Sequence, residues 1–334
     1  MNKAPLLIVG PSWVGDMVMA QSLFRLLHES RPHVPIDVIA PRWSLPVLAR
    51  MPEVRRGIAL PVAHRELGLG KRWQLARQLR ATGYTGAIVL PRSLKAALVP
   101  WLAGIPERTG FRGEMRYGVI NDMRTLDGDL LDQTVKRFIA LGLRRGDALP
   151  DIPEPRLEIS SENQQRLISD LRLAIDKPVI ALLPGAEYGP AKCWPLAYFR
   201  ELAGLLQEAG LAVWIMGSAA DRPAGEYIAH GTARNLCGST ELADAIDLLA
   251  YCEQAVSNDS GLLHVAAATG THVNALYGSS SPTYTPPLTT RRRIHYLDIE
   301  CSPCFERQCP LEHLRCLRDI RPQAVLAGIK SQLS

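Results

Sequence analysis

The stretch LLIVGPSWVGDMVMAQSLFRLL, residues 6–27, joins an apolar run of strand length to a segment whose apolar residues recur at helical spacing. A glycine-bearing turn lies between them. Such a turn normally offers backbone N–H groups and a positive helix end to an anion. Asp16 stands at the predicted helix start, however, and its carboxylate would repel a pyrophosphate. The stretch predicts a strand, turn and helix of an α/β fold, in which the turn either is not a nucleotide site or serves another task.

The same alternation of strand and helix continues along the chain in two series. In the first series we expect strands at 5–10, 36–40 and 87–90 and helices at 17–28 and 71–81. In the second we expect strands at 178–183, 212–216, 255–257 and 273–276 and helices at 197–209, 243–251 and 262–269. Short apolar strands that alternate with amphipathic helices indicate a parallel sheet covered on both faces. We therefore predict an α/β protein of two Rossmann-like, doubly wound domains facing across a cleft, with ligands at the carboxyl ends of both sets of strands.

The length of the chain also favours two domains, because 334 residues exceed the size at which a single core stops growing. We expect an N-terminal domain over 1–160, a linker region over 161–177 and a C-terminal domain over 178–318. A closing helix within 319–334 could cross back to the first domain. The longest apolar runs have only strand length, so we expect no signal peptide, no membrane span and a cytoplasmic protein.

Charge is unevenly distributed between the two halves. Residues 1–150 contain 22 Lys and Arg against 12 Asp and Glu, whereas the rest of the chain is acidic. A basic first half favours an anionic partner. Nucleic acid is one candidate, but the arginines are scattered without interleaved aromatic residues, so a small or lipid-borne anion is at least as well supported. A merely solvated basic surface is the alternative.

The first candidate phosphate-binding loop in the second half of the chain is PGAEYGPAKCWP, residues 184–195, which follows a predicted strand. Its glycines would let backbone amides approach a phosphate, and Lys192 could supply a point charge. The spacing differs from that of a P-loop, because Lys192 lies seven residues past Gly185 and precedes Cys193. For this pattern taken alone, a surface loop with a solvated lysine is the more common explanation.

Two further turns stand at predicted strand ends. In SNDSGLLHVAAATG, residues 257–270, Asp259 and Ser260 can cap a helix that begins near Gly261 and whose free N–H groups suit a phosphate. His264 on the first turn is either a buried structural histidine or a ligand contact. LYGSSSPTYTPP, residues 276–287, places a glycine-serine turn where a phosphate or sugar hydroxyl could bind.

Four of the seven cysteines cluster near the end of the chain, at Cys301, Cys304, Cys309 and Cys316. Without a secretory signal a disulfide framework is disfavoured, and the spacing suggests a structural zinc site. Reduced thiols that pack a loop are the alternative.

Taken together, GPSWVGDMVMAQSLFRLL, LPRSLKAALVPWLAGIPERTGFRGEMRYG, PGAEYGPAKCWP and SNDSGLLHVAAATG resemble, in this order and spacing, the ADP-heptose:lipopolysaccharide heptosyltransferases. The resemblance covers nearly the whole chain and is strongest to the members that add the second heptose. It implies the GT-B architecture, ADP-heptose as donor, inversion at the anomeric carbon, and a lipid A–Kdo–heptose acceptor. It also implies peripheral contact with anionic lipid at the inner leaflet of the inner membrane and no nucleic-acid partner.

The resemblance also implies roles for individual residues. Asp16 matches the general base that takes the proton of the attacking hydroxyl, and Lys192 matches the cation that stabilises the departing ADP. The implied donor-binding residues are Gly185, Ala186, Glu187, Gly217, Asp221, Asp259, Ser260, Gly261 and His264. The implied acceptor-binding residues are Trp13, Gly15, Arg92, Lys95, Arg112 and Arg116. No D-x-D pair stands where Mg²⁺ would bridge a diphosphate, so we expect catalysis without a metal cofactor.

Three alternatives belong to other classes of activity. A heptosyltransferase that acts on Kdo, or another GT-B enzyme such as a nucleotide-sugar 2-epimerase, would use the same phosphate loops. The basic first half argues against the epimerase. A nicotinamide-dependent oxidoreductase is disfavoured, because no predicted strand is followed by G-x-G-x-x-G with an acidic residue at the required distance.

Overall fold

The computed structural model describes residues 4–63, 66–231 and 233–333. The chain divides into two compact units, unit 1 (Met1–Pro155) and unit 2 (Arg156–Ser334). Both units are α/β, which confirms the predicted fold class.

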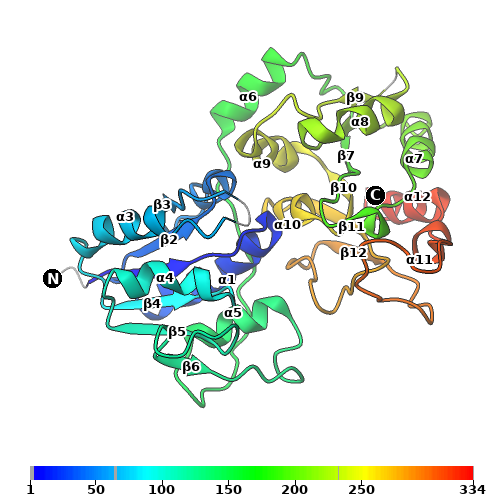
Figure 1. Ribbon diagram of the computed structural model, residues 1–334. Coiled ribbons are helices and arrows are strands. Elements are labelled where there is room, and N and C mark those ends of the chain that lie inside the picture. The colour runs from blue at the N-terminus through cyan, green and yellow to red at the C-terminus, as the bar shows by residue number, and fades with distance from the viewer. Residues whose placement is uncertain (1–3, 64–65, 232, 334) are drawn as a thin grey trace. The chain divides into compact units, whose positions relative to one another are not determined.

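Within the described residues, unit 1 contains a six-stranded parallel sheet in the order β3-β2-β1-β4-β5-β6 (Figure 1). The strands are β1 (Leu6–Val9), β2 (Ile36–Ala40), β3 (Val54–Ala59), β4 (Gly86–Val89), β5 (Glu107–Phe111) and β6 (Asp122–Arg124). The helices are α1 (Val14–Ser30), α2 (Leu45–Leu48), α3 (Leu69–Arg80), α4 (Leu94–Leu102) and α5 (Thr134–Gly142), with a 3-10 turn η1 (Arg42–Ser44).

The central strands of unit 1 are apolar because helices cover both faces of the sheet. Leu7 and Val9 of β1 pack in one core cluster with Leu75 of α3 and Ala97 of α4. Helices α1 and α5 lie side by side (Figure 1). They approach closely at Gly142, where a Cβ atom would lie 2.4 Å from Leu23 Cδ1. The strand-turn-helix unit predicted from residues 6–27 is present as β1 and α1.

Among the described residues of unit 2, a second six-stranded parallel sheet has the order β12-β11-β10-β7-β8-β9. Its strands are β7 (Val179–Leu183), β8 (Ala212–Ile215), β9 (Arg234–Asn235), β10 (Gln254–Asn258), β11 (His272–Leu276) and β12 (Arg292–His295). The helices are α6 (Ser161–Asp170), α7 (Leu196–Glu208), α8 (Arg222–Ala229), α9 (Leu242–Tyr251), α10 (Gly261–Ala268), α11 (Arg315–Arg318) and α12 (Pro322–Lys330), with 3-10 turns η2 (Pro190–Lys192) and η3 (Ala219–Asp221).

The predicted linker over 161–177 is corrected by the structure. Residues 161–170 form α6, which packs on α9 as part of unit 2. The side chain of Ser160 caps the helix by accepting from Asn163 N–H at 3.2 Å. Asn163 Nδ2 in turn donates to Asp247 Oδ2 of α9 at 2.7 Å. The polar stretch that suggested a linker is therefore a helix whose polar side chains bond to its neighbour.

The expectation that the closing helix crosses back to the first domain is also corrected. Val325 and Ile329 of α12 are fully buried in the core cluster that also contains Phe199 and Leu202 of α7. Gln254 Nε2 of β10 donates to the backbone oxygen of Ile329 at 2.9 Å. Helix α12 thus belongs to the core of unit 2.

Candidate active site

The candidate phosphate-binding loops of unit 2 meet at one edge of its sheet. Strands β7 and β10 are parallel neighbours, so their carboxyl ends lie together. Lys192 follows β7 and Asp259 follows β10. Lys192 Nζ lies 2.5 Å from Asp259 Oδ2, with the lysine side chain 19% exposed and the aspartate side chain 5% exposed. The fold therefore brings the two predicted residues into a largely buried ion pair.

His264 completes this group from the first turn of α10. Its Nε2 lies 4.0 Å from Asp259 Oδ1. Burial lowers the pKa of His264 to about 4, with the charge of Lys192 acting in the same direction and Asp259 opposing it. Within the described part of the chain, its Nδ1 is a buried atom without a hydrogen-bond partner. His264 is thus a neutral imidazole at pH 7.

Helix α10 begins at Gly261, as the sequence predicts, with Ser260 at the N-cap position. The Ser260 side chain makes no capping hydrogen bond to the helix. Its Oγ lies instead 3.4 Å from Ser257 Oγ. The N-terminal amides of α10 and the Ser260 hydroxyl therefore stand beside the Lys192–Asp259 pair, where an anion would gain both hydrogen bonds and the favourable end of the helix dipole.

Asp221 lies beside the same loop, although its carboxylate has local partners. It accepts from Ser218 N–H at 2.8 Å and Ser218 Oγ–H at 2.7 Å in a capping box at η3. A Cβ atom on Gly185 or on Gly217 would lie 2.9 Å from Asp221 atoms, so both glycines are needed for this close approach. Ala186 and exposed Glu187 belong to the same loop.

Sequence reasoning missed one feature of this edge, Asn258, whereas the glycine-serine turn after β11 was among its candidates. Asn258 is fully buried at the end of β10, where its Nδ2 donates to Pro184 O at 2.6 Å and its Oδ1 accepts from Trp194 N–H at 2.9 Å. A polar residue at the end of a buried strand was the available signal. After β11, the hydroxyls of Ser279 and Ser280 are buried without hydrogen-bond partners in the described residues. Orphaned hydroxyls at a strand's carboxyl end suit a polar ligand.

In unit 1, Asp16 lies in the first turn of α1 and directly follows the β1 loop. The N-cap residue of α1 is exposed Trp13, so Asp16 is not the cap of this helix. The Trp43 indole donates to Ser12 O at 2.9 Å and holds this loop. Gly15, in the first turn of α1, is buried. The helix start favours the charged form of the Asp16 carboxylate.

Basic residues of unit 1 gather at the carboxyl ends of β4 and β5. In the sheet, β4 is the neighbour of β1, and β5 follows β4. Arg92 follows β4, Lys95 lies in the first turn of α4, and exposed Arg112 follows β5. Arg92 Nε donates to Arg112 O at 3.2 Å. Three predicted acceptor residues thus share one sheet edge with Asp16.

The acceptor-contact role predicted for Arg116 is wrong. Its side chain is fully buried, and Nη1 donates to Pro91 O at 2.7 Å while Nε donates to Phe111 O at 3.1 Å. Burial lowers the pKa of this guanidinium. Arg116 therefore ties the two basic loops together from inside the unit.

The cysteine cluster gives no support to the predicted zinc site. Among residues 4–63, 66–231 and 233–333, no three His, Cys, Asp or Glu side chains are arranged to hold a metal ion. The four thiols are free, and Cys316 is buried. Burial, together with the charges of Cys301, Cys309 and Cys304, raises the pKa of Cys316 to about 11.

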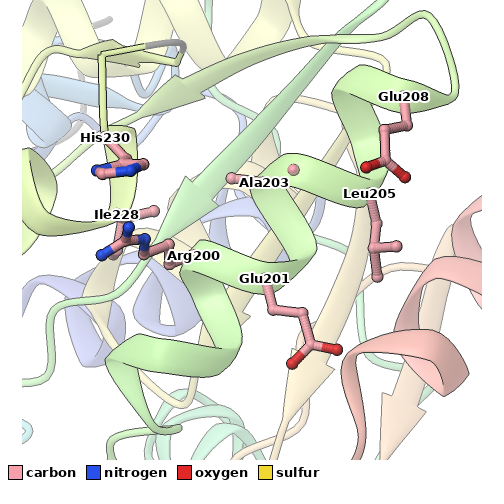
Figure 2. Close-up of a pocket in the computed structure, with 8 residues that line it drawn as sticks. Arg200, Glu201, Ala203, Leu205, Glu208, Ile228 and His230 are labelled. Carbon is pink, nitrogen blue, oxygen red and sulfur yellow. The ribbon is translucent and has the colours of Figure 1, made fainter.

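A separate pocket of about 330 Å³ lies between α7 and the end of α8 and is lined by Arg200, Glu201 and His230 among others (Figure 2). None of the predicted site residues lines it.

Two α/β units, each built on a parallel six-stranded sheet, have the architecture of the GT-B class of glycosyltransferases. Residues 72–315 match the model of glycosyltransferase family 9 (heptosyltransferase). The chain belongs to this family.

The relatives and solved structures agree with that assignment. The chain is 44% identical over 342 residues to lipopolysaccharide heptosyltransferase 2 of Salmonella typhimurium and 43% identical over 341 residues to that of Escherichia coli, with 98% of each chain covered. The solved structure of E. coli ADP-heptose LPS heptosyltransferase II superposes with a TM-score of 0.88 at 42% identity and 98% coverage of both chains.

Proposed function

We propose that the protein transfers L-glycero-D-manno-heptose from ADP-heptose to the first heptose of the lipopolysaccharide inner core. The observation that carries this proposal is the likeness to heptosyltransferase 2 enzymes over 98% of the chain at 43–44% identity. The likeness to a heptosyltransferase 1 is weaker: that of Pseudomonas aeruginosa is 33% identical over 45% of this chain.

Asp16 is the proposed general base. An inverting transfer needs a carboxylate that takes the proton from the acceptor hydroxyl as its oxygen attacks the anomeric carbon. The new glycosidic bond forms as the bond to the ADP oxygen breaks, so ADP leaves with the bonding electron pair. Arg92, Lys95 and Arg112 on the same sheet edge supply cations for the carboxylates and phosphates of the acceptor.

Lys192 is the proposed cation for the departing diphosphate. Charge develops on ADP in the transition state, and a preorganised lysine beside a helix start stabilises it. Asp259 holds the ammonium in place before the donor arrives. The orphaned hydroxyls of Ser279 and Ser280 supply further partners. Asp221 is the proposed contact to the ribose of the donor.

We also propose peripheral contact with anionic membrane lipid. No helix in the described residues is long and apolar enough to cross a membrane. Helices α3 and α4 are neighbours that expose Trp73 (47%) and Trp101 (46%), and the Arg77 guanidinium lies 4.8 Å from the centre of the Trp73 ring. Exposed tryptophans beside arginines suit the headgroup region of an anionic bilayer.

The test is transfer from ADP-heptose to two deacylated acceptors, Kdo–heptose and Kdo alone, with ADP release and glycosylated product followed together. The proposal requires product with the heptose-bearing acceptor and none with Kdo alone. Product with Kdo alone assigns the first step instead. If the protein glycosylates neither acceptor, the proposal is wrong.

A further inference from the structure

The loop that carries Lys192 has little regular structure of its own. Between β7 and α7, the described residues form only the 3-10 turn Pro190–Lys192. The two ends of the loop are fixed by the buried side chain of Asn258, which bonds to Pro184 O and Trp194 N–H. The position of the middle of the loop must therefore depend on contacts with other segments.

Those contacts come from residues 305–307, which lie more than a hundred residues away in the sequence. Ala191 N–H donates to Arg307 O at 3.1 Å, and Arg307 Nε donates to Tyr188 O at 2.7 Å. Tyr188 Oη donates to Phe305 O at 2.8 Å. The two segments thus bond through backbone and side chains on both sides of Gly189.

Gly189 allows this close approach. A Cβ atom at this position would lie 2.5 Å from Arg307 O and 3.1 Å from Arg307 Cα. Because both are backbone atoms, they could not move aside without moving the segment. The contact between the two segments is therefore as tight as a glycine permits.

Tyr188 links this contact to the ammonium group. The Arg307 guanidinium lies 5.3 Å from the centre of the Tyr188 ring, and Lys192 Nζ lies 5.1 Å from the same centre. A cation within about 6 Å of an aromatic ring is attracted by the ring's quadrupole. Lys192 is thus held by Asp259 on one side and by a tyrosine on another, and the tyrosine is fixed by Arg307.

We propose that Arg307 is a positioning residue of the donor-phosphate site, which acts through Tyr188 to hold the Lys192 ammonium where the diphosphate binds. This inference rests on the proposed function for the identity of the diphosphate. Arg307 acts by geometry: its planar guanidinium donates to Tyr188 O and at the same time lies 5.3 Å from the centre of the Tyr188 ring. A lysine would keep the charge but lack the planar group.

The experiment compares Arg307→Ala and Arg307→Lys with wild type in ADP binding by calorimetry and in steady-state transfer. The matched control is Arg200→Ala, because the Arg200 guanidinium lies 5.2 Å from the centre of the Tyr227 ring in a similar contact. Arg200 lines the pocket that none of the predicted site residues lines (Figure 2). We expect both Arg307 variants to lower kcat/KM for ADP-heptose by about 10-fold or more. The KM for the acceptor and the properties of Arg200→Ala should match wild type. Full rescue by lysine, or wild-type values for Arg307→Ala, overturns the proposal.

A double-mutant cycle with Lys192→Ala separates positioning from direct contact. If Arg307 acts through Lys192, Arg307→Ala weakens ADP binding in the wild-type background and has no further effect in the Lys192→Ala background. Equal weakening in both backgrounds overturns the proposal. If Arg307→Ala does not fold, Tyr188→Phe, which removes only the bond to Phe305 O, is used in the same cycle with the same two outcomes.

The cycle also distinguishes this inference from the proposed function. A wild-type protein that binds ADP but transfers no heptose removes the proposed function, while the ADP-binding cycle still decides the role of Arg307. A wild-type protein that binds no ADP overturns both.

Discussion

Lys192 Nζ lies 2.5 Å from Asp259 Oδ2 although the two residues follow different strands of unit 2. The pair combines the proposed cation for the leaving diphosphate with a carboxylate that holds that cation in place. Neither group can be changed alone without leaving the other largely buried and unpaired.

Lys192→Ala should lower kcat by about 100- to 1000-fold, because the developing charge on ADP loses its preorganised cation. It should also lower the free energy of unfolding by about 1–3 kcal/mol, because the Asp259 carboxylate loses an ionic partner. Transfer kinetics and thermal denaturation measure the two effects. Lys177→Ala, at an exposed lysine of the same unit, is the control. Wild-type turnover by Lys192→Ala would rule out the catalytic role.

Arg116→Met should lower the free energy of unfolding by about 2–4 kcal/mol, because the Pro91 and Phe111 oxygens lose a buried charged donor. Arg112→Ala at an exposed position should leave stability within about 0.5 kcal/mol of wild type and raise the KM for the acceptor. Urea denaturation and acceptor titration separate the two arginines. A stable Arg116→Met variant with a selectively raised acceptor KM would restore the contact role that the structure denies.

The buried His264 should make folding sensitive to acid. Because its pKa is about 4 in the folded protein and about 6.5 when unfolded, the unfolded chain binds a proton first as the pH falls. The stability that depends on neutral His264 is full above pH 6.5 and is lost progressively as the pH falls toward 4. As the pH falls from 7 to 4, the free energy of unfolding of wild type should decrease by about 2–3 kcal/mol more than that of His264→Gln. Parallel stability curves for the two proteins over this range would contradict the burial of a neutral imidazole.

Trp73→Ser combined with Trp101→Ser should weaken binding to vesicles that contain phosphatidylglycerol by about 10-fold or more, because two interfacial side chains are lost. Binding of wild type should also fall with added salt. Vesicle co-sedimentation measures both, with neutral phosphatidylcholine vesicles as the control. Unchanged binding by the double variant would show that Trp73 and Trp101 do not contact the membrane.

Elemental analysis tests the zinc prediction. Protein without stoichiometric zinc, with a melting temperature that a chelator leaves unchanged, would rule out the zinc site. One zinc per chain, with a lower melting temperature after chelation, would show that the cysteine loop rearranges around a metal ion.

The sequence predicted the fold well where strands are apolar and buried on both faces, as in β1, β7 and β11. It missed β3, because the exposed Arg55 and Arg56 interrupt the apolar pattern that predicts a buried strand. Both arginines pair with fully buried Asp37 of β2, with Arg55 Nη2 2.6 Å and Arg56 Nε 3.0 Å from Asp37 Oδ2. Burial raises the pKa of Asp37, but hydrogen bonds from Arg55 and Tyr84 and the nearby arginine charges hold it below its ordinary value.

The site was predictable to the extent that glycine turns follow strands. Parallel neighbours place those turns at one sheet edge, which brought Lys192 and Asp259 together as the motifs suggested. The roles of Asn258, Arg116 and Arg307 depend on which backbone atoms a side chain meets across the fold. Local sequence pattern carries no such information, so the sequence predicts an acceptor contact for buried Arg116 and gives no signal for Arg307.

The most direct test of the account is the rate of heptose transfer from ADP-heptose to a deacylated Kdo–heptose acceptor by wild type and Asp16→Asn, measured together with ADP-heptose affinity. The account predicts that the variant loses at least about 100-fold in kcat while it binds ADP-heptose as wild type does. An Asp16→Asn variant that transfers heptose at the wild-type rate would show that the carboxylate after β1 is not the base.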